Sequence, residues 1–199
     1  MDALRLFLPI YLVLFLGGDF LWRSYVVWKQ TDINPYVLGN GDSAHDFIGR
    51  LFRLTIGAQV IVVMLYTFWS EGYTYLVSIN WLQSSILTVV GIVLLLVSLV
   101  WVVIAQAQMG SSWRVGIDTT HKTQLVQHGI FRLSRNPIFL GMRAMSLGLF
   151  LILPNALTLT TFVLSETLIH IQVRLEENHL AGLHGEQYAT YRKHTRRWL

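Results

Sequence analysis

The residues best suited to chemistry lie where a basic, turn-rich segment runs directly into an apolar stretch. This segment, residues 125–141, reads Leu-Val-Gln-His-Gly-Ile-Phe-Arg-Leu-Ser-Arg-Asn-Pro-Ile-Phe-Leu-Gly. In it Arg135 carries charge, Asn136 is a favourable helix N-cap, and Pro137 suits the first helical position, where a missing N–H costs nothing. Further along the chain, Glu176 and Glu177 are adjacent acids. These groups would form a polar site if the fold brought them together.

The composition places that site in a membrane protein. The chain has 199 residues, of which 53% are hydrophobic and only 13% charged, well outside the balance of a soluble domain. It contains no cysteine, which excludes disulfides, thiolate nucleophiles and cysteine-ligated metals. The formal net charge of +4 comes from basic residues at the ends of apolar segments. This pattern favours contact with anionic lipid headgroups and argues against a nucleic-acid partner.

Five apolar segments are long enough to cross a bilayer as helices. They are Leu4–Val27, Phe47–Trp69, Trp81–Ala107, Pro137–Leu153 and Ala156–Val173. The sequence therefore predicts an all-α integral membrane bundle of about five transmembrane helices, followed by a polar, helical C-terminal tail that begins at Arg174. We expect a single domain over residues 1–199, with three N-terminal spans in 1–107 and the polar loop, a helical hairpin and the tail in 108–199.

The charges of the loops predict how the bundle is oriented. The connections Lys29–Asp46 and Gln108–Asn136 and the tail from Arg174 hold ten of the fifteen lysines and arginines, and five spans put them on one side. The connections Ser70–Asn80 and Pro154–Asn155 hold none. By the positive-inside rule, we expect the N-terminus outside and the C-terminus in the cytoplasm, with the bacterial inner membrane as the location.

A tight turn brings the two polar motifs to the same depth. Pro154 and Asn155 leave room only for an antiparallel pair of helices. Its two arms, 135–154 and 155–176, each run about 30 Å at about 1.5 Å per residue, which is the thickness of the hydrocarbon core. The corner at Arg135 and the acid pair should therefore meet at the cytoplasmic face.

Four short motifs occur in a characteristic order in the second half of the chain. They are Gly110-x-Ser112-Trp113-Arg114, then Leu125-Val126-x-x-Gly129-x-Phe131-Arg132-x-x-Arg135-Asn136-Pro137-x-Phe139-x-Gly141, then Glu176-Glu177-x-x-Leu180, and Gly185-x-x-Tyr188-x-x-Tyr191. From about Gln108 to the C-terminus this pattern resembles the isoprenylcysteine carboxyl methyltransferase and phospholipid methyltransferase superfamily. The first three spans match that superfamily only in kind.

The resemblance implies an enzyme that binds S-adenosylmethionine and methylates a lipid-like or amphipathic acceptor. Carried over by position, the cofactor-binding residues are Gln124, Leu125, Val126, Phe131, Asn136, Pro137, Ile138, Phe139 and Glu176. A free helix N-terminus suits the carboxylate of the methionine moiety. Glu176 suits its ammonium group, and the two phenylalanines could face adenine or the sulfonium.

Several ionisable residues lie within the apolar segments, where such groups are costly unless they pair or serve a function. Glu166 and His170 are one helical turn apart in the fifth span, Arg174 follows one turn later, and Arg143 in the fourth span is the obvious counter-charge. They could bind the acceptor or form a buried structural pair, and both alternatives stay open. Asp19 in the first span is expected to pair with a basic residue near the same interface.

These positions give the predicted roles in catalysis and substrate binding. Catalytic roles fall to Glu177, Arg135, His170 and Glu166, with Glu177 as the group that orients or deprotonates the acceptor, and substrate binding to Arg174 and Arg143. Glu176 and His179 form a single Glu-x-x-His pair without a second such pair, so no metal site is predicted.

Two other functions remain open. One is a membrane reductase that uses a nicotinamide cofactor, because sterol reductases resemble the same C-terminal half and the loop Arg114–Arg135 could supply phosphate ligands. The other is a non-enzymatic membrane protein that has kept the scaffold. The second is favoured by Asn136 and Phe139, which stand where the superfamily commonly has histidine and tyrosine.

Overall fold

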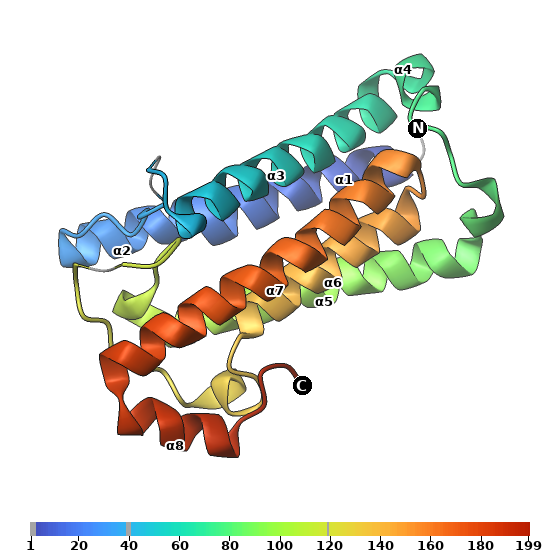
Figure 1. Cartoon of the computed structure of the whole chain (residues 1–199). Helices are drawn as coiled ribbons and strands as arrows, with labels where there is room; N and C mark the ends of the chain where they lie inside the picture. The colour runs from blue at the N-terminus through green and yellow to red at the C-terminus, as the bar shows by residue number, and fades with distance from the viewer. Residues whose placement is uncertain (1–2, 39–40, 119) are drawn as a thin grey trace.

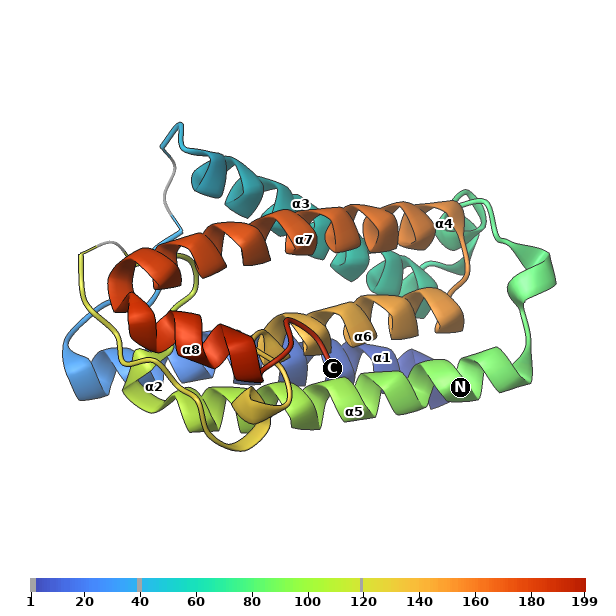
Figure 2. The same ribbon diagram turned by 60° about the horizontal axis from the view of Figure 1, so that its bottom comes forward.

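The computed structural model describes residues 3–38, 41–118 and 120–199, and the expected loops 29–46 and 108–136 contain the omitted positions 39–40 and 119. It confirms an all-α bundle, in which the long helices run side by side (Figures 1 and 2). The long helices beyond the first span are α3 (Ala44–Phe68), α5 (Ser85–Met109), α6 (Pro137–Ile152) and α7 (Ala156–His184). The shorter ones are α4 (Ser70–Thr74) and α8 (Glu186–His194), with single turns at Asn80–Leu82, Gly110–Ser112 and Gly129–Arg132.

The first span is helical over its whole length but changes its winding in the middle. It consists of α1 (Ala3–Leu12), the π-helix η1 (Val13–Trp22) and α2 (Arg23–Thr31). The sequence predicted one helix over Leu4–Val27, without the π-helical turns. Such turns commonly occur at functional sites. The span ends at Asp32, which adopts a left-handed conformation with φ of 54°.

The helices have the length and apolar character of an integral membrane protein. In the part of the chain that the structure describes, four helices are long and apolar enough to cross a bilayer: 3–31, 44–68, 85–112 and 156–184. The expected fourth span, α6, has 16 residues and extends about 24 Å, less than a hydrocarbon core of about 30 Å. The expected fifth span begins at Ala156 as predicted, and α7 continues without a break through Arg174 to His184, so the helical start of the tail belongs to the same helix.

The connections gather at the two ends of the bundle as the loop charges predict. At one end, the Ile79 amide donates to the Pro154 carbonyl at 2.8 Å. At the other, the Val37 amide donates to the Val115 carbonyl at 3.0 Å, and the Arg135 amide to the Arg196 carbonyl at 3.0 Å. Figure 1 shows α8 at this second end, opposite α4 and the N-terminus. The basic loops and the tail therefore share one face.

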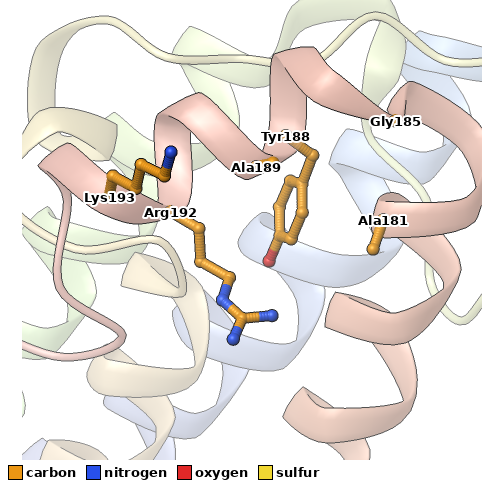
Figure 3. Close-up of a pocket in the computed structure, with 6 residues that line it drawn as sticks. All are labelled: Ala181, Gly185, Tyr188, Ala189, Arg192 and Lys193. Atoms are coloured by element: carbon orange, nitrogen blue, oxygen red, sulfur yellow. The ribbon is translucent and has the colours of Figure 1, made fainter.

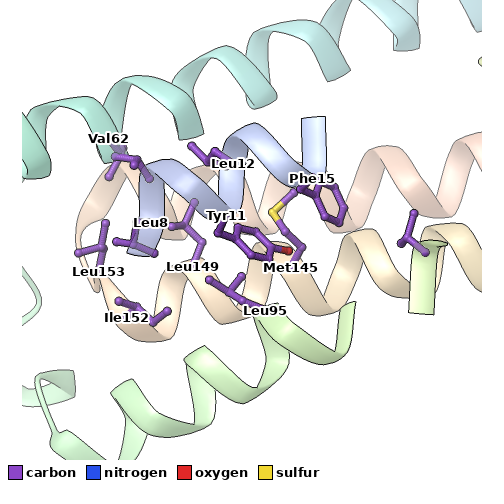
Figure 4. Close-up of a cluster of buried hydrophobic side chains, with 12 residues drawn as sticks. Leu8, Tyr11, Leu12, Phe15, Val62, Leu95, Met145, Leu149, Ile152 and Leu153 are labelled. Carbon is purple, nitrogen blue, oxygen red and sulfur yellow. The ribbon is translucent and has the colours of Figure 1, made fainter. Parts of the chain in front are cut away.

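The core lies between α1, α3, α5 and α6. Leu8, Phe15, Leu95 and Leu149 are almost completely buried in this cluster (Figure 4). Within it the Tyr11 hydroxyl and the Ser98 hydroxyl are 2.8 Å apart, so both find a hydrogen-bond partner in an apolar setting. This cluster fixes the first span against α5 and α6.

Glycines allow α5 and α6 to approach closely. A Cβ atom added at Gly148 would lie 2.9 Å from the Gly91 carbonyl oxygen, and one added at Gly91 would lie 2.7 Å from the Gly148 carbonyl oxygen. At Gly141 the added atom would meet a Val102 methyl group. Small residues at helix contacts are typical of membrane bundles, where close packing replaces the hydrophobic driving force. The position of the α6 N-terminus depends on this contact.

Gly148→Ala should therefore destabilise the bundle. The new methyl group would meet backbone, which cannot move aside as a flexible side chain can, and we expect a loss of about 1–3 kcal/mol, typical of overpacking. A melting curve in detergent measures it. Gly57→Ala on α3 is the matched control, because nothing lies within 4 Å of the added atom and alanine is the better helix former. Equal melting temperatures for the two variants would contradict the close contact.

Candidate active site

A buried carboxylate on α7 is the centre of the site. Glu177 is only 4% exposed. Its Oε1 accepts hydrogen bonds from Arg135 Nη2 at 3.0 Å and from Asn136 Nδ2 at 3.1 Å, and its Oε2 accepts from Arg197 Nη2 at 2.8 Å. Two guanidinium groups and an amide thus neutralise and satisfy the carboxylate, which is the condition for burying a charge. The predicted meeting of the Arg135 corner with the acid pair is confirmed.

The turn at Pro154 and Asn155 positions Glu177. The Asn155 side chain accepts from the Thr158 amide, and the Thr158 side chain accepts from the Asn155 amide, so the pair forms a capping box at the start of α7. From this fixed start, α7 runs back beside α6 to the face where Asn136 begins α6. The position of Glu177 along the bundle is therefore set by the number of helical residues between Asn155 and Glu177.

Asn136 does not cap α6 with its side chain, which corrects the sequence prediction. Its amide nitrogen donates instead to Glu177 Oε1 and, at 3.2 Å, to the Arg197 carbonyl. No side chain caps the first turn of α6 in the structure as described, and Pro137 occupies its first position. The N-terminus of α6 consequently keeps donor groups and a positive dipole end for another acceptor.

The C-terminal tail forms one wall of the site. The Ser134 hydroxyl donates to the Arg197 carbonyl at 3.1 Å, and Arg135 Nη1 donates to the Thr195 carbonyl. The hydrogen bond to Glu177 raises the pKa of Arg197 above its ordinary value. Sequence reasoning missed Arg197, since a basic tail next to a membrane span predicts a headgroup anchor. The one signal in the sequence was that the loop charges place the tail and Arg135 at the same end of the bundle.

Glu176 faces a different set of residues. Its Oε1 accepts from Gln172 Nε2 at 3.0 Å. Gln172 Oε1 lies 3.2 Å from His45 Nδ1, and His45 Nε2 accepts from the Ile117 amide at 3.0 Å. Glu176 is thereby connected to α3 and to the loop that follows α5. Of the two acids, it is Glu177 that contacts Asn136. His45 is a further polar residue that the sequence did not single out.

The residues predicted to bind the cofactor differ in how deeply they are buried. Phe131 is buried, and its carbonyl accepts from the Tyr191 hydroxyl at 2.6 Å. Pro137 is buried, Ile138 and Phe139 are partly buried on the first turn of α6, Leu125 and Val126 are partly buried, and Gln124 is exposed. Tyr191, the second tyrosine of the motif Gly185-x-x-Tyr188-x-x-Tyr191, thus fixes the turn that contains Phe131.

An aspartate anchors the loop that leads to these residues. Asp118 is buried and accepts hydrogen bonds from Arg114 Nε at 3.1 Å and from the amides of Thr120 and His121, both at 3.0 Å. Burial raises the pKa of Asp118, but the hydrogen bonds from Thr120, His121 and Arg114 outweigh burial and hold it below its usual range. The loop is therefore fixed by an ionised carboxylate at neutral pH.

The ionisable residues expected near the acceptor separate into two groups. Arg143 and Glu166 form a bidentate pair, with Nε and Nη2 each 2.9 Å from a carboxylate oxygen. The Trp198 ring lies 4.6 Å from the Arg143 guanidinium and 5.5 Å from the His170 ring, so this residue of the tail joins both. Arg174 is exposed and donates to the His170 carbonyl of its own helix.

A pocket of about 290 Å³ opens at the junction of α7 and α8. It is lined by Ala181, Gly185, Tyr188, Ala189, Arg192 and Lys193. Figure 3 shows the side chains of Tyr188 and Arg192 extending from α8 in the same direction. Its lining combines an aromatic ring with two cations, which suits a water-soluble anion or an aromatic ring system.

The fold and these residues define a helical membrane protein with a polar site at one end of the bundle. The sequence profile of the phospholipid methyltransferase family matches residues 86–187, from α5 to the start of α8. The chain belongs to this family. No curated protein matches it significantly. The match includes Arg135, Asn136, Glu176 and Glu177, but ends before Arg197.

Replacing the central acid should loosen both the bundle and the tail. In Glu177→Gln, Arg135 and Arg197 face a neutral acceptor, and we expect a loss of about 1–3 kcal/mol, the range for hydrogen bonds to charged groups. Trypsin should then cut faster at Arg196 and Arg197. The measurements are a melting curve and the mass of the trimmed protein. The exposed Glu186→Gln is the control, and a tail that stays protected in Glu177→Gln would contradict the assignment.

Proposed function

We propose that the protein transfers a methyl group from S-adenosylmethionine to a lipid-like or amphipathic acceptor at the cytoplasmic face of a membrane. The observation that carries this proposal is the contact of Glu177 with Arg135 and Asn136 within the family's matched region. Two motifs of that family meet where the apolar helices end. The family also favours methyl transfer over a nicotinamide-dependent reductase.

The residues present fit the proposed cofactor. The uncapped N-terminus of α6 offers amide donors for a carboxylate. Glu176, half-buried and bonded on one oxygen to Gln172, offers an acceptor for an ammonium group. Phe139 and Phe131 add aromatic surface for a ring or a cation. Gln124, Leu125 and Val126 complete the proposed shell, and Pro137 and Ile138 shape the turn between them.

When bound, S-adenosylmethionine would supply an electrophilic methyl group, and the chain would have to position an acceptor and exclude water. Glu177 already accepts from two guanidinium groups, so it suits holding Arg135 and the tail in place better than removing a proton. His170, whose partly buried imidazole ring contacts the Trp198 ring at a near-perpendicular angle, suits proton removal from the acceptor. Arg143 and Glu166 would face the acceptor's polar end, with Arg174 at the outer edge.

The proposed orientation follows from charge. The basic loops and the tail lie at the same end of the bundle as Glu177. If that end faces the cytoplasm, as the positive-inside rule favours, the N-terminus lies outside and the site is open to a cytosolic cofactor.

A calorimetric titration with S-adenosylmethionine and with its demethylated product tests the cofactor. We expect both to bind, because both carry the same carboxylate and ammonium groups. Glu176→Gln should weaken both by about tenfold or more, as for a lost charge-assisted hydrogen bond. Glu186→Gln on α8 is the matched control and should bind as the wild type does. Absence of binding by both ligands to the folded protein would refute the proposal, and full affinity in Glu176→Gln would remove that residue from the site.

His170→Ala tests the proposed acceptor side. Loss of a general base should lower turnover about 100-fold or more, while cofactor affinity and melting temperature stay unchanged. Transfer of labelled methyl groups into a total membrane lipid extract measures turnover. The exposed Thr167→Ala, on the same helix, is the control. A lower melting temperature without a selective loss of turnover would make His170 a structural partner of Trp198.

A further inference from the structure

A network of hydrogen bonds connects the first turn of α3 to Glu176, the acid proposed to bind the ammonium group of the cofactor. Gln172 Nε2 donates to Glu176 Oε1 at 3.0 Å, and Gln172 Oε1 lies 3.2 Å from His45 Nδ1. His45 Nε2 accepts from the Ile117 amide at 3.0 Å. The network thus joins α3, α7 and the loop after α5. Its residue on α3, His45, lies outside the stretch 86–187 that the family profile matches.

The two ends of this network determine where its protons lie. An ionised carboxylate only accepts hydrogen bonds, so Gln172 presents Nε2 to Glu176 and keeps Oε1 for His45. Because that oxygen is an acceptor, His45 must carry a proton on Nδ1. At the other end, the Ile117 amide only donates, so His45 Nε2 must carry a lone pair. Both ends independently require the same neutral imidazole, protonated on Nδ1.

The surroundings of His45 hold its imidazole in this position. Ser43 caps α3 by accepting from the Asp46 amide at 3.1 Å, which fixes the turn that contains His45. The loop after α5 approaches at Gly116, where φ is 104° and an added Cβ atom would lie 3.0 Å from His45 Nε2. Glycine is the residue that allows both this conformation and this approach. Each imidazole nitrogen therefore has a partner on a fixed element.

The contact with Gln172 determines how Glu176 is presented. Gln172 is 4% exposed, so water cannot readily replace a partner that its amide loses. Hydrogen bonds shielded from water are also stronger than those at the surface. Gln172 occupies Oε1 of Glu176, while no donor among the described residues bonds Oε2. One oxygen of the carboxylate is thus held in place, and the other is available to a ligand.

We propose that His45 and Gln172 are positioning residues for the cofactor, which hold Glu176 so that its second oxygen can accept from the ammonium group. Neither residue needs to touch the cofactor, because both act through Glu176. This inference rests on the proposed function, in which Glu176 binds that group. It gives the N-terminal half of the chain a part in cofactor binding, through the first turn of α3.

The ligand-free protein offers a test that does not depend on the cofactor. The two neutral tautomers of histidine differ in which nitrogen carries the proton, and both partners of His45 require Nδ1. The ¹⁵N NMR signals of the imidazole distinguish the two. A His45 protonated on Nε2 would overturn the proposal, because it would have no donor for Gln172.

Two substitutions of His45 separate its two contacts. In His45→Asn the amide nitrogen can take the place of Nδ1 and donate to Gln172, whereas in His45→Gln the longer side chain can offer an oxygen to the Ile117 amide. Calorimetric titration with S-adenosylmethionine compares them. We expect wild-type affinity in His45→Asn and about tenfold weaker binding in His45→Gln, which loses the donor to Gln172. The reverse order would make His45 an anchor of the loop and overturn the proposal.

A ligand without the ammonium group distinguishes positioning from general support of the fold. 5′-Methylthioadenosine keeps the nucleoside and the sulfur of the demethylated product but lacks its amino-acid part. Gln172→Leu should weaken the demethylated product about tenfold and leave 5′-methylthioadenosine unchanged, because only the former carries the group that Glu176 binds. Equal losses for the two ligands would make Gln172 a structural residue and overturn the proposal.

A double-mutant cycle tests whether His45 acts through Glu176. In a Glu176→Gln background, His45→Gln should cost no further affinity, since residues of one hydrogen-bond network do not contribute additively. Additive losses would overturn the proposal. His194→Gln, at an exposed histidine of α8, is the matched control and should bind as the wild type does.

The same titrations separate this inference from the proposed function. If the wild type binds neither S-adenosylmethionine nor its demethylated product, the proposed function fails and the positioning role fails with it. If the wild type binds both and His45→Gln and Gln172→Leu bind them equally well, the positioning role alone is refuted.

Discussion

The buried charge of Glu177 is the constraint on which the site depends. A carboxylate that is 4% exposed must be neutralised and hydrogen-bonded, and its partners come from two segments that lie far from it and from each other in the sequence. Arg135 and Asn136 lie before α6, Glu177 lies on α7, and Arg197 lies beyond α8. Satisfying this one group therefore brings the loop, the hairpin and the tail to one place. An apolar residue at 177 would remove the reason for that convergence.

The apolar part of the fold gives this polar contact its precision. Gly91 and Gly148 let α5 and α6 approach backbone to backbone, and the capping box at Asn155 fixes where α7 begins. Both ends of the hairpin are thus determined before any charge is considered. The two helices of the hairpin then place Asn136 opposite Glu177. The functional end needs little packing of its own, and its loop can be held by polar anchors such as Asp118.

Hydropathy and charge predicted the elements well because lipid imposes strict rules on long helices. Four of the five expected spans, the tight turn at Asn155 and the meeting of Asn136 with Glu177 follow from the lengths of the segments. The partners of individual polar groups do not. Asn136 is a residue type that commonly caps helices, yet its side chain forms a hydrogen bond with Glu177 and does not cap α6. Arg197 lies in a basic tail typical of a lipid anchor, and its contact with Glu177 is visible only in the folded structure. The π-helical turns around Asp19 leave no periodic signal in so uniformly apolar a segment.

Two sets of ionisable residues inside the apolar spans show how differently the same cost can be met. Arg143 and Glu166 neutralise each other through two hydrogen bonds and are covered by Trp198, so this set is complete within the chain. Asp19, Arg23 and Gln106 lie in one groove between η1 and α5, and each has a buried atom without a hydrogen-bond partner among the residues that the structure describes, so the expected pairing of Asp19 with a basic residue is not found there. A chain that needed only stability would replace the second set with apolar residues, because lipid is the solvent there. Within the described part of the chain, the first set therefore meets its own burial cost and the second does not.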